Sequence, residues 1–493
     1  MLTQPSAHRL AAALALLLPT VISCGAPSPT QDSGAESATP RLRVTRGSAD
    51  LRTLASAPRE KTWIYQLSMP FQVAKGKAAL FWGIREGQAK GADFEVGVDV
   101  VVFEDLAAIS AQEAVPVTRN HAEPNPNTEP SGAPAIMVKY PVRGGFQPLG
   151  AKAADGSPLP HTGTGFGMNQ AIAWPSGEPE GPPPYPVNYF RGSEGYQYLE
   201  VHQFSYDGEV FRVEGTERVS LTGMFEGWAI LDGAMTNAIP DGEDFLIGVR
   251  AEPWNLAEKG RHPWVSPTSG TAVMRWRRKE GRWRPVSIAP VTDSNQSFEP
   301  SLIRDVDGSL LFCARGGPEM DHNDIRVWQS RDEGQNWKKI VHVRGLVSSA
   351  PITLNQAVDG TPYVVANLYE VFVHPGRKVY TYRDTRGRVR GGGWTRKTLM
   401  LWPLNDQRTG LQEPILVRDC RADFGRPPGG SVWVADHPSG MTLHLADGKW
   451  HHVLAYRVLE LAELSHAIEP APQTGGYIEE VLSAGPPIPV WQF

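Results

Sequence analysis

The segment Ser330–Trp337 (SRDEGQNW) constrains the fold of this chain more than any other stretch of the sequence. It fits the pattern Ser-x-Asp-x-Gly-x-x-Trp at every fixed position. The side chains of Ser330 and Asp332 can hydrogen-bond to the amides of a tight turn. Gly334 permits the positive φ that such a turn requires, and Trp337 can fold back to cover it. The segment therefore predicts a tight hairpin between two antiparallel strands.

A second hairpin is predicted immediately upstream, in residues 298–315 (FEPSLIRDVDGSLLFCAR). Two short apolar runs flank the Asp307–Gly308 turn, with Glu299 near the beginning and Arg315 at the end. Long segments with helical periodicity are scarce beyond residue 60. The chain is therefore predicted to be all-β. Further Asp-Gly turns followed by apolar runs occur at residues 207–208, 359–360 and 447–448.

The pattern in Ser330–Trp337 resembles the Asp-box of sialidase-type β-propellers, a structural turn at the periphery of a blade. The order of residues before it (Glu299, apolar strand, Asp-Gly turn, strand, Arg315) also resembles that superfamily. The resemblance implies a sialidase-like β-propeller. Blades need about four short strands each, so the roughly 430 residues after the N-terminal segment would form six blades, with seven as the alternative.

The resemblance also implies roles for three residues. Glu299 would be the base, or charge partner, of the catalytic group, and Arg315 would bind the carboxylate of the substrate. Arg396 opens the segment RKTLMLW and resembles a second arginine of the same clamp, with Arg383 and Arg377 as rival candidates and a surface strand residue as the alternative. Arginine suits this task because its planar guanidinium matches a carboxylate with two parallel hydrogen bonds.

The sequence departs from the family where the catalytic tyrosine is expected. That position lies in residues 434–440 (VADHPSG), so Asp436 and His437 stand in its place. We expect these two side chains to replace or support the tyrosine in catalysis. The family's first arginine, in an Arg-Ile-Pro motif, has no counterpart here, and no early segment supplies the expected acid/base aspartate.

A polar cluster, Asp321–Asp324 (DHND), lies between Arg315 and the predicted turn. On a loop that projects toward the site, His322 could act as a general base or a metal ligand, with Asp321 and Asp324 orienting it, and His322 and Asp324 are assigned to substrate binding. A polar turn that caps a hairpin is the alternative. The sequence contains no HExxH, P-loop, GxSxG or Cys-rich metal pattern, so no metal or cofactor is predicted.

The N-terminus has the features of an export signal. The apolar run at residues 10–22 is too short to span a bilayer permanently and ends in VISC, which resembles a bacterial lipobox. Residues 1–23 are therefore predicted to be a lipoprotein signal peptide and Cys24 its lipidation site, with an ordinary secretory signal as the alternative. Residues 24–55 are predicted to be a flexible tether, because they are rich in Gly, Ala, Pro, Ser and Thr.

The remaining residues, 56–493, are assigned to the propeller, with loop insertions around residues 119–190, which are rich in Pro, Gly and Asn. The formal charge of −5 gives no basic footprint, so nucleic acid is not expected as a partner. Cys313 and Cys420 could pair or remain as buried thiols, and the sequence leaves both open.

These observations predict an exported, lipid-anchored protein of the bacterial cell envelope, associated with the membrane only through its anchor. Its expected partner is a glycan or acidic polysaccharide, cleaved by an exo-sialidase-like glycoside hydrolase. One alternative is a polysaccharide lyase on the same scaffold, with His322 or His437 as the base and Arg315 neutralising the substrate carboxylate. The other is a glycan-binding propeller without catalysis, since one fold hosts many functions.

Overall fold

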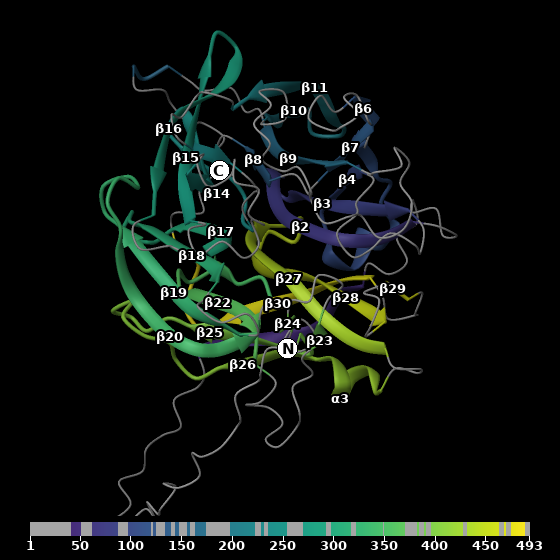
Figure 1. The fold of residues 1–493 in the computed structure, drawn as a ribbon, viewed down its shortest axis with the longest axis vertical. Coiled ribbons are helices and arrows are strands. Elements are labelled where there is room, and N and C mark those ends of the chain that lie inside the picture. Colours follow the sequence, from purple (N-terminus) through teal and green to yellow (C-terminus); the bar gives the residue numbers. More distant parts are fainter. Residues whose placement is uncertain are drawn as a thin grey trace, which may run out of the picture. The chain divides into compact units, whose positions relative to one another are not determined.

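The apolar runs and Asp-Gly turns of the sequence form antiparallel strands in the computed structural model (Figure 1). The predicted signal peptide and Cys24 lie outside the residues that the structure describes. The described residues are 41–50, 62–86, 97–119, 122–124, 134–139, 143–146, 155–157, 163–173, 198–221, 228–230, 235–253, 270–291, 297–316, 322–348, 350–369, 382–383, 389–390, 396–426, 431–462, 468–469 and 475–488.

Six sheets of four or more antiparallel strands make up the described part of the chain. The first sheet contains β2 (Thr62–Ala74), β3 (Lys77–Glu86), β4 (Gly97–Phe103) and β5 (Val115–Arg119). The second contains β6 (Ala122–Pro124), β7 (Pro134–Lys139), β8 (Arg143–Phe146), β9 (Gly163–Ala173), β10 (Tyr198–Tyr206) and β11 (Phe211–Ser220). The third contains β12 (Trp228–Ile230), β13 (Ile239–Asp241), β14 (Asp244–Pro253), β15 (Gly270–Lys279) and β16 (Arg282–Pro290).

The other three sheets complete the series. The fourth contains β17 (Ser297–Arg304), β18 (Leu310–Gly316), β19 (His322–Ser330) and β20 (Lys338–Ser348). The fifth contains β21 (Thr353–Gln356), β22 (Pro362–Asn367), β25 (Thr398–Pro403) and β26 (Ile415–Asp419). The sixth contains β27 (Ser431–His444), β28 (Trp450–Ala462), β29 (Ile468–Glu469), β30 (Gly475–Ser483) and β1 (Leu42–Asp50). The short elements outside these sheets are η1 (Leu106–Ala111), β23 (Tyr382–Arg383), β24 (Val389–Arg390) and α3 (Cys420–Phe424).

The inner strands of the sheets form a closed ring of contacts. Strand β2 packs against β8, β8 against β13, and β14 against β17. Strand β17 then packs against β21, β21 against β27, and β27 returns to β2. Sheets arranged radially with one inner strand each form a β-propeller, so the predicted all-β propeller fold is confirmed.

The N-terminal strand β1 completes the sixth sheet. In the sixth sheet the order is β27, β28, β30 and β1, and β1 pairs antiparallel with β30 from Leu42 opposite Ser483. The first described strand of the chain is therefore the outermost strand of the last sheet. Because β1 lies within the segment predicted to be a tether, the boundary at residue 55 is wrong, and the propeller begins earlier.

The hairpin predicted for Ser330–Trp337 joins β19 to β20, the two outer strands of the fourth sheet. Ser330 Oγ accepts a hydrogen bond from the Gly334 amide (2.9 Å), and Asp332 Oδ1 accepts one from the Asn336 amide (2.9 Å). Gly334 has φ +86°, and the Trp337 indole donates to its carbonyl oxygen (2.9 Å). Each contact expected from the residue pattern is present, on the outer side of the sheet.

Aromatic packing joins the turn to the core of the fourth sheet. Phe312 meets Trp328 and Trp337 edge-on, with ring centroids 6.0 and 5.5 Å apart. All three side chains are buried. Edge-to-face pairs of this kind add about 0.5–1.5 kcal/mol each beyond the area that they bury. The tryptophan of the turn therefore stabilises the sheet rather than facing a ligand.

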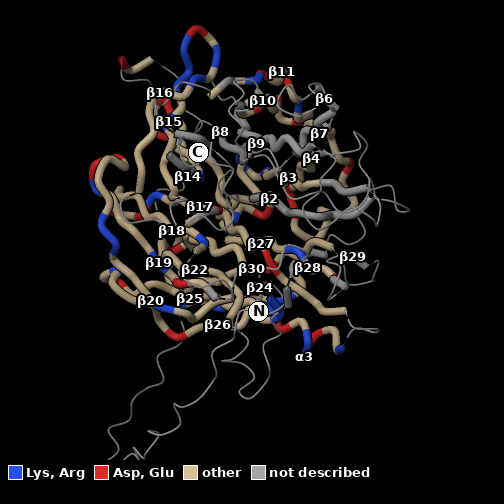
Figure 2. Tube along the Cα trace, viewed as in Figure 1, with Lys and Arg blue, Asp and Glu red and all other residues tan. Residues whose placement is uncertain are grey.

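The arginine-rich hairpin at residues 273–286 is formed by β15 and β16, with Lys279 opposite Arg282. Basic and acidic positions are mixed along it (Figure 2). Arg275 and Arg277 both donate to Asp244 of the neighbouring strand, at 3.0 and 2.7 Å. These arginines are thus part of an ion-pair network.

Other local predictions can be compared directly with the strands. All four Asp-Gly turns join consecutive antiparallel strands: β10–β11, β17–β18, β21–β22 and β27–β28. The region 119–190, predicted to be loop insertions, also contributes β6 to β9, because its short apolar runs pair within the second sheet. The loop interpretation of this region is therefore only partly correct.

Cys313 and Cys420 are buried free thiols. Cys313 lies in β18, whereas Cys420 is the first residue of α3, and the two belong to separate apolar clusters. Burial raises the pKa of the Cys313 thiol to about 12, so it stays protonated and unreactive. Of the alternatives left open by the sequence, buried unpaired thiols are correct. Within the described chain, no helix is long and apolar enough to cross a bilayer.

Candidate active site

Glu299 lies at a β-bulge in the inner strand of the fourth sheet. Phe298 pairs with Arg315 and Pro300 with Ala314, so Glu299 is the extra residue between them. Its φ of +50° is in the left-handed region, which costs a non-glycine residue about 1–2 kcal/mol. Strained bulges of this kind re-aim a side chain and cluster at functional sites.

Arg315 binds the carboxylate that this bulge presents. Its Nη1 donates to both oxygens of Glu299, at 3.0 and 2.9 Å. The two side chains remain 13% and 15% exposed, respectively, so the pair is partly accessible to solvent. The two residues expected at the site from their order in the sequence therefore lie in contact, paired with each other.

Asp436 and His437 lie at a second bulge, in the inner strand of the sixth sheet. The register of β27 against β28 shifts between Asp436, opposite Arg457, and Ser439, opposite Ala455. His437 has φ +51°, the same left-handed backbone as Glu299. Two of the predicted site residues are thus held in strained conformations on two inner strands.

Asp436 is almost completely buried and is surrounded by cations. Arg457 Nε donates to its Oδ1 at 2.5 Å, and Arg396 Nη1 donates to its Oδ2 at 2.5 Å. Nδ1 of His437 lies 3.1 Å from Oδ1. The carboxylate is therefore shared among three side chains, of which Arg457 comes from the adjacent strand β28.

Arg396 reaches this site from the fifth sheet. It occupies the turn before β25, and its carbonyl oxygen accepts a hydrogen bond from the Ala435 amide at 2.8 Å. The backbone contact fixes Arg396 beside β27, and its side chain is 18% exposed. The alternative of a simple surface strand residue does not describe this position.

Electrostatic coupling joins the two bulges into one group of six residues, here called the site cluster. Burial alone would raise the pKa of Glu299, but the charges of Arg315, His437 and Arg396 outweigh it and leave this pKa below its ordinary value. The same balance, with Arg457 as the main cation, holds the pKa of Asp436 well below its usual range. Both carboxylates are consequently ionised at neutral pH. The site cluster consists of Glu299, Arg315, Arg396, Asp436, His437 and Arg457.

The pKa of His437 is also lowered, but in a histidine this favours the neutral form. Burial and the Arg457 charge lower the pKa of His437, and the nearby carboxylates Asp436 and Glu299 only partly compensate. The imidazole is therefore neutral near pH 7. Three arginines and two carboxylates then give the cluster a formal charge of +1. A partly exposed group with this charge is suited to binding an anion.

The structure does not bring Asp324 to this cluster. Asp324 is buried on β19, where its carboxylate binds His342 Nε2 at 2.8 Å and the Gly345 amide at 2.9 Å. Both partners belong to the outer strand β20, which β18 and β19 separate from the strand that carries Glu299. His322 is the first residue of β19, and its side chain lies outside the described part of the structure.

Sequence reasoning missed Arg457, which had been assigned no function. It follows Tyr456 on β28, a tyrosine whose hydroxyl donates to Glu479, away from the site cluster. The signal that could have revealed it is the hairpin register: counting back from the Asp447–Gly448 turn places residue 457 opposite residue 437, and the bulge shifts it to residue 436. The extra residues of the bulge obscure that count.

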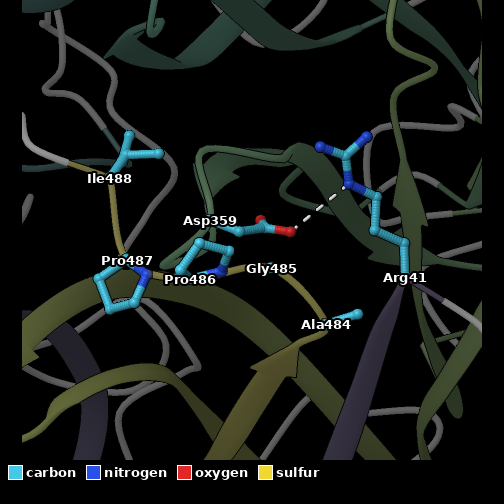
Figure 3. Close-up of a pocket in the computed structure, with 7 residues that line it drawn as sticks. All are labelled: Arg41, Asp359, Ala484, Gly485, Pro486, Pro487 and Ile488. Carbon is cyan, nitrogen blue, oxygen red and sulfur yellow. Dashed lines mark hydrogen bonds and ion pairs between the residues drawn. The ribbon is translucent and has the colours of Figure 1, made fainter.

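A pocket of about 570 Å³ lies at the opposite end of the strands, beside the Asp359–Gly360 turn (Figure 3). Arg41 faces Asp359 across it, with Nε 3.5 Å from Oδ2, and Pro486, Pro487 and Ile488 form part of the wall. It contains none of the predicted site residues. In the described residues, no group of three or more His, Cys, Asp or Glu side chains is arranged to hold a metal ion.

The sequence matches no family model and no curated protein. Among solved structures, the Trypanosoma rangeli sialidase is similar at 12% identity and a TM-score of 0.46, covering 90% of this chain. This chain spans only 59% of that sialidase. The Penicillium chrysogenum α-L-arabinanase is similar at 9% identity and a TM-score of 0.43, with 87% of this chain and 97% of that chain covered. The NanB sialidase of Streptococcus pneumoniae is similar at 10% identity and a TM-score of 0.45, with 88% and 70% covered.

Proposed function

We propose that the protein is an exported glycoside hydrolase of acidic glycans and that the site cluster binds the carboxylate of the sugar. The observation that carries this proposal is the placement of three arginines against two ionised carboxylates, on strained bulges of two inner strands. A sugar carboxylate would bring the formal charge of the cluster from +1 to neutrality. Arg315 and Arg396 are the proposed contacts, and Glu299 is the proposed charge partner of the reacting group.

A polysaccharide lyase is the second candidate, and the neutral imidazole of His437 favours it. Removal of the proton α to a uronate carboxylate requires a base and a cation that stabilises the developing charge. His437 and the neighbouring arginines offer both. The two reactions leave different products, because only elimination creates an unsaturated sugar that absorbs ultraviolet light.

The test is an assay of sialosides, uronate polysaccharides and neutral glycans with wild type and Glu299→Gln. The readouts are new reducing ends and ultraviolet absorbance. We expect sugar release from acidic glycans without new absorbance, reduced about 100-fold or more by Glu299→Gln. Glu333→Gln is the matched control: Glu333 also has a left-handed φ, of +57°, but lies on the outer turn between β19 and β20.

Each other outcome has a defined meaning. New absorbance would replace the hydrolase by the lyase. Release from neutral glycans alone would contradict the carboxylate-binding role of Arg315 and Arg396. Binding of acidic glycans without any product would indicate a binding propeller. The absence of both binding and turnover would contradict the proposed function.

The proposed location rests on the N-terminal sequence. Lipidation of Cys24 would hold the mature protein at a membrane of the bacterial envelope. Cys24→Ser is expected to move the protein from the membrane fraction to the soluble fraction after export. An unchanged membrane fraction would contradict the lipid anchor.

A further inference from the structure

His437 is the residue of the site cluster whose ordinary pKa lies nearest to neutrality. The other members are arginines and ionised carboxylates, which keep their charge across the neutral range. A reaction that moves a proton therefore needs His437 if it is to use this cluster. The hydrolase proposal above leaves open which residue performs that transfer.

The geometry leaves one nitrogen of the imidazole available. Nδ1 faces Oδ1 of Asp436 at 3.1 Å, although the ring N–H is not well aligned with that oxygen. Nε2 has no hydrogen-bond partner in the described chain, and 13% of the side chain is exposed. An imidazole that carries its proton on Nδ1, beside a carboxylate, presents the lone pair of Nε2 to a ligand.

Asp436 is in turn fixed from two sides. Arg457 on β28 and Arg396 before β25 each hold one of its oxygens, and its exposed fraction is 1%. A carboxylate held in this way cannot rotate away from His437 without breaking its ion pairs with Arg457 and Arg396, which is unfavourable for a buried charge. Asp436 and Arg457 are therefore positioning residues, whereas His437 is the group that can meet the substrate.

The backbone supports the same assignment. His437 keeps a left-handed φ in the middle of a strand, although glycine would adopt this conformation with less strain. Nδ1 of His437 makes no well-aligned hydrogen bond, so hydrogen bonding within the described residues does not account for an imidazole at this position. A strained backbone conformation that no stabilising contact explains is typical of a functional position.

We propose that His437 is the general base that activates water in the hydrolysis of an acidic glycoside, an inference that rests on the proposed function. Nε2 takes a proton from water while the water oxygen bonds to the anomeric carbon. The bond from that carbon to the leaving oxygen breaks, its electron pair stays on that oxygen, and a proton from solvent completes the leaving group. Single displacement by water inverts the anomeric configuration.

The charged groups around His437 set the expected pH dependence. The charge of Arg457 on β28 opposes its protonation, whereas Asp436 on β27 and Glu299 on β17 favour it, and Arg396 before β25 and Arg315 on β18 are the other cations of the cluster. With burial added, the pKa of His437 is lowered, so the active neutral form is lost only below about pH 6.5. The kcat/KM of wild type should therefore be constant near neutrality and fall toward acid.

The experiment compares wild type, His437→Gln and His437→Gly on the acidic glycan that wild type cleaves. We expect His437→Gln to lower kcat by about 100-fold or more, to change KM little and to lose the acid limb of the pH profile. His437→Gly should fold well because glycine suits this backbone, and added imidazole should restore part of its activity. His451→Gln, a change of an outer histidine on β28, is the matched control and should retain activity.

The outcomes separate this inference from the proposed function. Inversion of the anomeric centre, followed by proton NMR of the first product, together with imidazole rescue supports the base. Normal kcat in His437→Gln, retention of configuration, or an unsaturated product would overturn the water-activating role while leaving an active protein. A wild type that cleaves no acidic glycan would overturn the proposed function itself, and this role with it.

Discussion

Two groups of arginine and carboxylate side chains among the described residues differ in backbone strain. In the site cluster, Glu299 and His437 have left-handed backbones, and several side chains remain partly exposed. In the second group, Arg418 donates to the Tyr456 hydroxyl at 2.7 Å and to Glu479 at 2.6 Å, and Glu479 is completely buried. The second group, here called the closure cluster, consists of Arg418, Asp423, Tyr456 and Glu479.

The closure cluster joins the strands that complete the ring. Glu479 on β30 accepts hydrogen bonds from Arg418 on β26, Tyr456 on β28 and the Gly47 amide on β1. The Arg418 guanidinium also lies over the ring of Tyr477, 5.2 Å from its centroid. Its hydrogen bonds and ring contacts hold neighbouring strands together, and none of its side chains sits at a strained bulge. Both clusters contain buried charge, so the site cluster is distinguished by its strained backbone, and the proposed function rests on that difference.

The largest expected effect on stability is in the closure cluster. Arg418→Met would leave Glu479 buried without its main cation, which should lower the free energy of unfolding by about 3–5 kcal/mol. Chemical denaturation of the two proteins measures this difference. The kcat/KM of the folded fraction should be unchanged, and a selective loss of activity would contradict the structural assignment of this cluster.

Arg315→Met is the matched change in the site cluster. Water can reach the partly exposed Glu299, so the stability loss should be smaller, about 1–3 kcal/mol. The main effect should be on the substrate: loss of one charged hydrogen-bond donor should raise KM for an acidic glycan about 10–100-fold. Equal effects of Arg315→Met and Arg418→Met on KM would contradict the claim that only the site cluster binds substrate.

Strain can be tested directly at His437. Replacement by glycine should raise the free energy of unfolding by about 1 kcal/mol, because the left-handed φ is then no longer unfavourable. Replacement by alanine keeps the strain and serves as the control. Thermal denaturation of both variants measures the difference, and a glycine variant no more stable than the alanine variant would show that the bulge stores no strain.

The smallest expected effect concerns an outer pair in the same sheet. His451 Nδ1 lies 2.8 Å from Glu480, and its Nε2 lies 3.1 Å from Asp447. The hydrogen bond to Glu480, followed by that to Asp447, raises the pKa of His451 despite burial. A raised pKa stabilises the fold fully below the unfolded-state value of about 6.5, and this stabilisation is lost as pH rises through the folded value.

His451→Gln should therefore lower stability by up to about 1 kcal/mol at pH 5.5 and much less at pH 9. Denaturation of wild type and variant at the two pH values measures the difference in their free energies of unfolding. A difference in the free energy of unfolding that is equal at both pH values, or larger at pH 9, would contradict the ion pairs at His451.

Local patterns explain what the sequence could predict. The hairpin of Ser330–Trp337 and the Asp-Gly turns depend on contacts within a few residues, so residue types and spacing are sufficient. The hairpin that carries Glu299 and Arg315 is also local, because one turn brings its two ends together, although the ion pair between these side chains was not predicted.

Contacts between sheets could not be predicted in this way. The bulge at Asp436 and the approach of Arg396 from the fifth sheet depend on the register of strands distant in sequence. Asp324 was assigned to the site because it is near Arg315 in the chain, but it faces the outer strand β20. The tether boundary was wrong for a related reason: β1 is a strand only because β30, more than 400 residues later, pairs with it.

The central claim is that the site cluster, and not the closure cluster, recognises a sugar carboxylate. The most direct measurement is calorimetric titration of wild type, Arg315→Met and Arg418→Met with sialic acid and glucuronic acid, each compared with its uncharged methyl ester. We predict that wild type and Arg418→Met bind at least one acid about tenfold or more tightly than its ester, and that Arg315→Met loses this preference. Equal binding of acid and ester by wild type, or a preference that survives in Arg315→Met, would contradict the claim.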